Sequence, residues 1–266
     1  MTGARTWDAS TYHTISCPQA AMAQAVLDRL ELRGDETVLD AGCGSGRVTA
    51  ALLERLPRGR VVAVDADAGM VEHARETLPA DRVEVHHQSL TELRLDAPVD
   101  AAFSNAVFHW IPDHDALFAA LARALRPGGR LSAQCGGHGN VARVQAAADA
   151  LAAEPALCER FAGWRGPWHF AGPRDTQRRL HAAGFTEVAC WLEPWPVSPD
   201  DVETYLRTIC LGPYLERLPE AEHERFAAAV AQRVGGELDY VRLNIVARMP
   251  SKAVEWRHAT GPGAAH

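Results

Sequence analysis

The feature that most constrains the fold is a glycine-rich loop, GCGSG at residues 42–46, between two segments of different periodicity. Residues 36–40 form a short apolar run that predicts a buried strand, and residues 47–56 repeat apolar side chains at helical spacing. A strand, a tight glycine turn and a helix in succession predict the first unit of an α/β fold. In such folds ligands bind beyond the carboxyl ends of the strands, so the loop lies where a ligand is expected.

The alternation of strands and helices continues along the chain. An Arg-Pro-Gly-Gly run at residues 126–129 ends one helix, because proline lacks an amide donor and glycine permits positive φ. Strands linked by helices predict an α/β, mostly parallel sheet of seven strands with helices on both faces. The expected strands are 36–40, 60–65, 81–87, 100–104, 129–135, 186–192 and 240–247, and the helices between the first five are 47–56, 68–78 and 113–125.

Composition argues against several classes of function. The net charge of −7 over 266 residues disfavours nucleic acid and anionic membranes, both of which require a basic surface. No segment approaches the roughly 18 consecutive apolar residues of a membrane span. The six cysteines include no C-x-x-C pair, so reduced thiols in a cytoplasmic protein are expected. No metal site is expected, and the expected binding partner is a small molecule. Nothing in the sequence indicates the oligomeric state.

The loop has the properties of an adenosine-cofactor site. Its glycines let the backbone approach a ligand closely. Asp65 ends the second expected strand, where a carboxylate can accept hydrogen bonds from both hydroxyls of a ribose. The glycines follow a G-x-G-x-G pattern, not the G-x-G-x-x-G of a dinucleotide fold, but these features alone fit NAD or any other adenosine cofactor.

Four motifs together narrow the choice of adenosine cofactor. They are D-x-G-x-G-x-G at 40–46, V-D-x-D-x-x-M at 64–70, S-N-A at 104–106 and L-R-P-G-G-x-L at 125–131. In this order and spacing they resemble the class I S-adenosylmethionine-dependent methyltransferases over about residues 36–135. The resemblance implies a Rossmann-like, doubly wound sheet and S-adenosyl-L-methionine as cofactor, with S-adenosyl-L-homocysteine as product.

The resemblance also implies a set of cofactor-binding residues. The loop and Asp40 would surround the methionyl end, Asp65 would hold the ribose, and Asn105 would lie under the sulfonium. Ser89 stands where the family usually carries an aspartate that accepts from the adenine amino group. The full expected set is Tyr12, Asp40, Gly42, Cys43, Gly44, Gly46, Asp65, Ala66, Asp67, Met70, Ser89, Leu90, Asn105 and Ala106.

A closer resemblance is to the trans-aconitate methyltransferase group. It rests on W-D-x-x-x-Y at 7–12, the run FSNAVFHWIPD at 103–113 and L-N-I-V-A-R at 243–248. The related juvenile-hormone-acid methyltransferases also carry an H-W after the fourth strand. Both groups esterify carboxylic acids, so the resemblance implies carboxyl O-methylation to a methyl ester.

This chemistry suggests candidates for the catalytic side chains. A carboxylate is ionised at neutral pH and needs no general base, so neutral donors suit it: the indole of Trp110 first, with the amide of Gln19. His109 and His13 are second candidates. If the acceptor were instead a hydroxyl or carbon of a natural-product intermediate, one of these histidines could act as the base. Trp110 as a core aromatic, His109 as a structural histidine and a non-catalytic cofactor-binding module remain alternatives.

The expected division of the chain places a cap over the acceptor. Trp164, Trp168 and Phe170 either line an apolar acceptor pocket or attach the cap to the sheet. If they line the pocket, the acceptor is more apolar than a tricarboxylate, which would require several arginines; Arg143, Arg165 and Arg242 are available, but the sequence does not place them. The expected parts are an N-terminal arm and helix over the cofactor site at 1–35, the core at 36–136 and 174–250, the helical cap at 137–173 and a disordered tail at 251–266.

Overall fold

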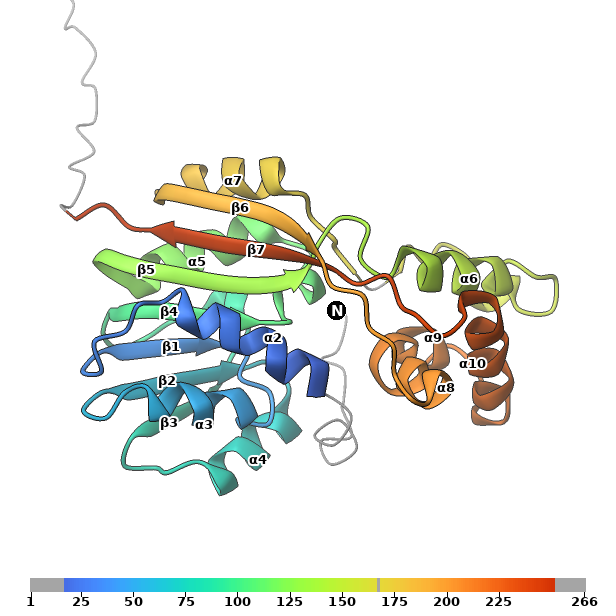
Figure 1. Cartoon of the computed structure of the whole chain (residues 1–266), viewed down its shortest axis with the longest axis horizontal. Coiled ribbons are helices and arrows are strands. Elements are labelled where there is room, and N and C mark those ends of the chain that lie inside the picture. The colour runs from blue at the N-terminus through green and yellow to red at the C-terminus, as the bar shows by residue number, and fades with distance from the viewer. Residues whose placement is uncertain (1–16, 167, 252–266) are drawn as a thin grey trace, which may run out of the picture.

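The computed structural model describes residues 17–166 and 168–251, which form a seven-stranded sheet with helices on both faces (Figure 1). The strand order is β3-β2-β1-β4-β5-β7-β6, with the first five strands of the chain parallel and β7 antiparallel to both of its neighbours. This confirms the α/β, doubly wound, mostly parallel sheet. The strands are β1 Thr37–Ala41, β2 Arg60–Asp65, β3 Val83–His87, β4 Val99–Asn105, β5 Leu125–Gly136, β6 Thr186–Pro194 and β7 Val241–Arg248.

The central strands are buried on both faces, as parallel strands under helices must be. In β1, Val38 packs on one face of the sheet with Leu27 of helix α2, whereas Leu39 packs on the other face with Leu117 of helix α5. The alternation follows from the two-residue period of a strand. The two cores therefore fix which face each helix covers.

Each helix over the sheet buries one face against it. Helix α2 contacts β4 and β5 on one face, whereas α5 contacts β5 and α7 on the other. None of the described side chains of α2 lines the large cavity discussed below, so the expected cover of the cofactor site by this helix is not seen in the part described. The helices beside the sheet are α2 Cys17–Asp28, α3 Arg47–Glu54, α4 Ala68–Thr77, α5 His114–Ala124 and α7 Pro173–Ala182.

The remaining helices form a separate unit beside the sheet (Figure 1). Its core brings Val144 and Ala148 of α6 against Val230 of α10, around the fully buried Tyr214. The unit is larger than the expected cap at 137–173, because the helices after β6 join it and are not part of the sheet core. Periodicity shows that a helix buries a face but not against which neighbour. The helices are α6 Ala142–Ala152, α8 Val202–Tyr205, α9 Gly212–Leu215 and α10 Glu220–Val234, with the short turns η3 Cys158–Phe161 and η4 Leu206–Cys210.

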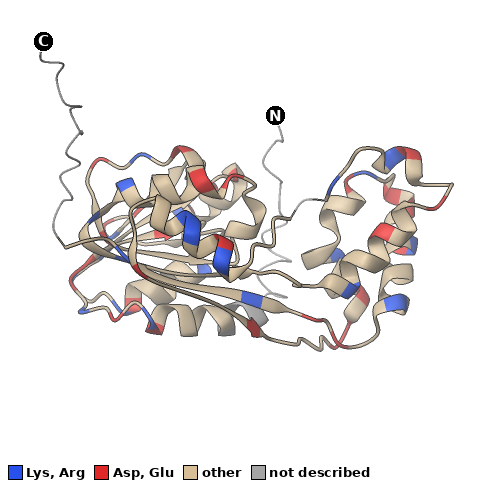
Figure 2. Ribbon diagram, turned by 90° about the horizontal axis from the view of Figure 1, so that it is seen from above, with Lys and Arg blue, Asp and Glu red and all other residues tan. Residues whose placement is uncertain are grey.

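Charges of both signs are interspersed over the surface (Figure 2). No helix in the described part of the chain has the length and apolar character needed to cross a membrane. The arm at 1–16 and nearly all of the tail predicted to be disordered, 252–266, lie outside the described residues.

Candidate active site

A cavity of about 950 Å³ opens at the carboxyl ends of β1, β2 and β4. Strands β1 and β4 are neighbours, and the chain continues from β1 to β2 on one side and from β4 to β5 on the other. The strand order therefore reverses between β1 and β4, which is where doubly wound sheets bind ligands. The volume is at the upper end of the range for small-molecule pockets. Ile209, Cys210 and Pro213 of the helical unit complete the wall opposite the sheet. The cavity is therefore shared between the two parts of the molecule.

The glycine loop uses its own amide donors for internal bonds. The amides of Gly42 and Cys43 donate to the carbonyl of Val64, at 2.8 and 3.0 Å, and the amide of Gly44 donates to Asp65 Oδ2 at 2.8 Å. Gly42 has a φ of 89°, and a Cβ there would lie 2.3 Å from a methyl of Val107. A loop whose amides are already satisfied is poorly suited to hold a pyrophosphate. The shape of the loop therefore argues against a dinucleotide.

A buried carboxylate, Asp40, and a half-buried one, Asp65, give this end of the cavity an acidic character. Asp40 is 1% exposed and accepts a 2.7 Å hydrogen bond from Thr49 Oγ1. Burial raises the pKa of Asp40 to about 7. Burial also raises the pKa of Asp65, although the amides of Gly44 and Asp67 donate to it. Such a site fits a ligand with positive charge and hydroxyl donors. S-adenosylmethionine, with its sulfonium, ammonium and ribose hydroxyls, meets both requirements.

Most of the expected cofactor residues line the cavity, and the side chains of two of them cap helical segments. Asp67 caps α4 by accepting from the amide of Met70 at 2.8 Å, and Ser89 caps the turn η1 (Leu90–Glu92) by accepting from the amide of Thr91 at 3.4 Å. These caps fix the ends of segments that follow β2 and β3. The expected cofactor residues that line the cavity are Asp40, Gly42, Cys43, Gly44, Asp65, Ala66, Asp67, Met70, Ser89, Leu90, Asn105 and Ala106.

Gly46 differs in position from the other glycines of the motif. It does not line the cavity but begins α3 with a φ of 84°, and a Cβ there would lie 2.8 Å from Leu78. The left-handed turn and the close packing against Leu78 are sufficient reasons for a glycine at this position. Tyr12 and His13 lie outside the described residues, and Gln19 lies on α2 at a position whose side chain is not described.

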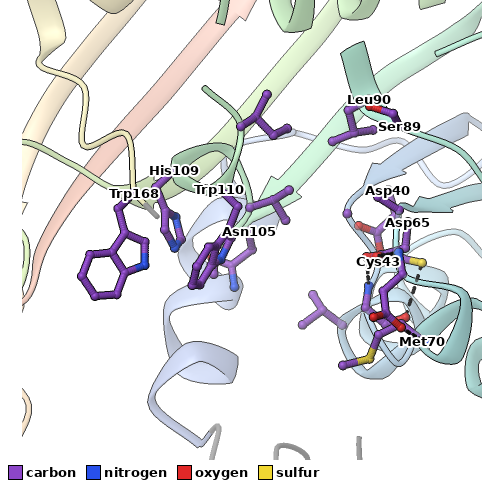
Figure 3. A pocket seen from close by; sticks show the side chains of 18 of the residues that line it. Asp40, Cys43, Asp65, Met70, Ser89, Leu90, Asn105, His109, Trp110 and Trp168 are labelled. Atoms are coloured by element: carbon purple, nitrogen blue, oxygen red, sulfur yellow. Dashed lines mark hydrogen bonds between the residues drawn. The ribbon is translucent and has the colours of Figure 1, made fainter. Parts of the chain in front are cut away.

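Aromatic side chains line the other end of the cavity (Figure 3). His109 and Trp110 belong to the turn η2 (Phe108–Trp110) after β4. The Trp110 ring lies 6.1 Å from that of Trp168, and the His109 ring stacks on Phe170 at 5.8 Å. Trp164 does not take part: it packs edge-on against Tyr214 at 4.7 Å, within the core of the helical unit. Of the three aromatic residues, Trp168 and Phe170 therefore line the cavity, whereas Trp164 has a packing role in the helical unit.

The structure also adds a wall residue whose position the sequence left open. Arg242 lies on β7, is 2% exposed and lines the cavity. Its Nε donates to Gln134 Oε1 at 3.4 Å. An arginine inside a mostly apolar strand was a signal in the sequence, although its position could be interpreted only once the order of the strands in the sheet was known. Other wall residues that were not expected are Ser45, Arg47, Val48, His87, Gln88, Thr91, Glu92, Phe103, Val107, Ile111, Pro112, Asn140, Val141, Ile209, Cys210, Pro213 and Tyr240.

Two wall residues have unusual backbone conformations. Ala106 and the β-branched Val141 have φ values of 61° and 46°, in the region that side chains other than glycine rarely adopt. Ala106 is held there because its amide donates to the carbonyl of Gln134 at 2.7 Å. Strain of this kind is retained where the surroundings impose it, commonly at ligand sites. Among the described residues no group of three or more His, Cys, Asp or Glu side chains could hold a metal ion.

Comparison with known proteins identifies the family. Residues 38–129 match the model of a methyltransferase domain. The chain is 35% identical over 237 residues to a trans-aconitate 2-methyltransferase of Azoarcus sp. strain BH72, covering 84% of this chain and 87% of the relative. It is 29% identical over 256 residues to a trans-aconitate 2-methyltransferase of Deinococcus radiodurans, covering 94% and 93%.

Solved structures share the fold at lower identity. Phosphoethanolamine N-methyltransferase 2 of Haemonchus contortus, in complex with S-adenosyl-L-methionine, has a TM-score of 0.59 at 17% identity, covering 91% of this chain and 56% of that one. The cyclase SpnF has a TM-score of 0.59 at 19% identity, covering 88% and 81%. The fold alone therefore does not fix the reaction. The sequence relatives do fix the family: this chain is an S-adenosylmethionine-dependent methyltransferase and belongs to the family of the trans-aconitate 2-methyltransferases.

Proposed function

We propose that the enzyme transfers a methyl group to a carboxylate oxygen of a small organic acid that carries one anionic group and an apolar body. The observation that carries this proposal is the buried guanidinium of Arg242 at the end of the cavity that Trp110, Trp168 and Phe170 line. A cation in such surroundings attracts an anionic group more strongly than it would in water. The sequence relatives, which are named for a carboxylic acid, support the same reaction.

We assign the cofactor to the acidic end of the cavity. Asp40 and the loop 42–46 would hold its methionyl end, Asp65 its ribose hydroxyls, and the segment from Ala66 to Met70 would border the ribose and adenine. The raised pKa values of Asp40 and Asp65 support this assignment, because a cationic ligand favours the ionised carboxylates. Ser89 and Leu90 would border the adenine, and Asn105 and Ala106 the sulfonium.

The reaction needs positioning more than proton transfer. The cofactor supplies an electrophilic methyl group on sulfur: a carbon–oxygen bond forms as the carbon–sulfur bond breaks, giving a methyl ester and S-adenosylhomocysteine. A carboxylate is already ionised at neutral pH, so no proton has to be removed. The wall must align the acceptor oxygen with the methyl carbon, which is an orientation effect. Arg242 would attract the carboxylate, and Trp110 would orient it with its indole N–H.

The aromatic end of the cavity, where the methyl acceptor would bind (the acceptor end), favours an acid with one charge. Trans-aconitate carries three carboxylates, and burying each of them without a cation is costly. Among the described wall residues, Arg242 is the arginine at the aromatic end, whereas Arg47 belongs to α3 beside the glycine loop. Trp168, Phe170 and Ile209 offer apolar surface in place of further charge. An arylalkyl or branched-chain monocarboxylic acid matches this wall better than a tricarboxylate does.

A matched series of acceptors tests the proposal. An arylalkyl acid, its amide, its alcohol and trans-aconitate would be compared with wild-type enzyme, Arg242→Lys and Arg242→Gln, while cofactor affinity and melting temperature are followed as controls. We expect turnover of the monoacid alone, and a KM for it raised by about 10- to 100-fold in Arg242→Gln, less in Arg242→Lys, because a charged hydrogen bond is lost. Turnover of the alcohol in preference to the acid would refute carboxyl methylation. Preference for trans-aconitate would retain the reaction and refute the apolar monoacid.

A further inference from the structure

The orientation of His109 determines what its ring can do in the cavity. Its Nδ1 accepts a 3.2 Å hydrogen bond from the amide of Gly136, at the end of β5. An amide N–H can only donate, so Nδ1 must carry a lone pair and not a proton. In the neutral ring the proton is then on Nε2. No acceptor among the described residues bonds that nitrogen, while the ring itself forms part of the cavity wall.

The surroundings keep the ring in this form. Phe170 stacks on it at 5.8 Å and Trp110 tilts against it at 5.1 Å. Pairing with Arg242 on β7 holds Gly136 in place, and Phe170 packs so closely that a Cβ on Gly136 would lie 2.6 Å from it. Burial, followed by the charges of Arg242 and His114, lowers the pKa of His109 well below its usual value. The ring is therefore neutral across the physiological range of pH.

We infer that His109 is a hydrogen-bond donor to the acceptor carboxylate, through Nε2–H, and not the general base of the reaction. A base must present a lone pair to the acceptor, whereas here the lone pair of His109 is taken by the backbone and the other ring nitrogen carries the proton. Gly136 stands opposite Arg242 in the sheet register, so the donor ring and the guanidinium flank the same part of the wall. This inference rests on the proposed function, because it assigns His109 to the binding of a carboxylate.

Two amide variants separate the hydrogen-bond donor role of Nε2 from the structural role of the ring. His109→Asn retains an acceptor near the position of Nδ1 for the amide of Gly136 but loses the outer donor. His109→Gln can place an amide N–H near the position of Nε2. We expect the KM for the acid in His109→Asn to rise at least about tenfold over that in His109→Gln, the loss of one hydrogen bond to a charged group, with cofactor affinity unchanged. Equal kinetics for the two variants would overturn the donor role.

The protonation state has its own test, independent of turnover. In wild-type protein labelled with ¹⁵N-histidine, the signal that disappears in His109→Gln should have the chemical shifts of a neutral ring protonated at Nε2, and should keep them as the pH is lowered through 6.5, the ordinary pKa of histidine. A ring protonated at Nδ1, or one that titrates near pH 6.5, would overturn the inference. A limb in the pH profile of kcat/KM that is lost in His109→Gln would identify a base instead. An alkali-stable methylated product would refute the proposed function and leave the measured tautomer unaffected.

Discussion

Replacing Asp40 by asparagine should change the stability of the cofactor-free enzyme in a pH-dependent way. The side chain is 1% exposed, and burial is the main reason why its pKa rises from 3.8 to about 7. Thr49 Oγ1 donates to Asp40 Oδ2 at 2.7 Å, a bond that the amide oxygen of asparagine can also accept. The substitution therefore removes the ionised form while retaining the local hydrogen bond.

The magnitude follows from linkage between protonation and folding. An acid whose folded pKa is raised destabilises the protein little below the unfolded pKa of 3.8, increasingly as pH rises, and fully above the folded pKa of about 7. A shift of about three units corresponds to about 4 kcal/mol at pH 8, at 1.36 kcal/mol per unit, and the same relation leaves about 1.7 kcal/mol at pH 5. The free energy of unfolding of Asp40→Asn, relative to wild type, should therefore increase by about 2.5 kcal/mol between pH 5 and pH 8.

Urea unfolding of both proteins without cofactor, at pH 5 and at pH 8, measures this difference. Any cost of burying the asparagine amide group is the same at both pH values and cancels. The affinity for S-adenosylmethionine should fall in the variant even where stability rises, because the ionised carboxylate is what a cationic ligand favours. A stability difference that is the same at both pH values would show that Asp40 is ionised in the fold at pH 5, and would refute this account of the acidic end.

Three further predictions concern single residues. Asp65→Ala should weaken S-adenosylmethionine binding by about 1.5–3 kcal/mol in calorimetry, from the loss of charged hydrogen bonds, and unchanged affinity would remove Asp65 from the site. Trp110→Phe retains the ring and loses the indole donor, so turnover should fall more than cofactor affinity; a fall in affinity alone would make Trp110 structural. Burial is the main cause that lowers the pKa of His114, so the unfolded state takes up the proton first as pH falls below 6.5. The free energy of unfolding should then fall more steeply with decreasing pH below 6.5 in wild type than in His114→Gln, and the two proteins should show the same pH dependence above pH 7.

The cofactor end of the site could be predicted from sequence because its parts are local. The loop 42–46 follows β1 directly, and Asp65 ends the neighbouring strand, so a motif and a strand assignment suffice to bring them together. The motif could not distinguish ligand contacts from packing. Gly46 belongs to the same pattern as Gly44, yet Leu78 occupies the space that a side chain of Gly46 would take.

The acceptor end depends on contacts between distant parts of the chain. Arg242 meets Gly136 across an antiparallel pair that no local pattern specifies. Trp164 and Trp168 stand four residues apart in one aromatic stretch and both pack against the core of the helical unit, but of the two only Trp168 also lines the cavity. Their separation depends on how the helices α6 to α10 assemble, and this is set by complementary apolar faces that periodicity alone does not pair.

The most direct test of the central claim is to identify the acceptor atom that receives the methyl group. The enzyme would be incubated with S-adenosylmethionine labelled in the methyl group and a panel of aryl and alkyl monocarboxylic acids, trans-aconitate, phenols and alcohols, and each labelled product would be treated with mild alkali. Carboxyl methylation predicts that the label is released as volatile methanol, which only a methyl ester yields under these conditions. A labelled product that survives alkali would place the methyl group on a hydroxyl oxygen or on carbon, and would contradict the claim.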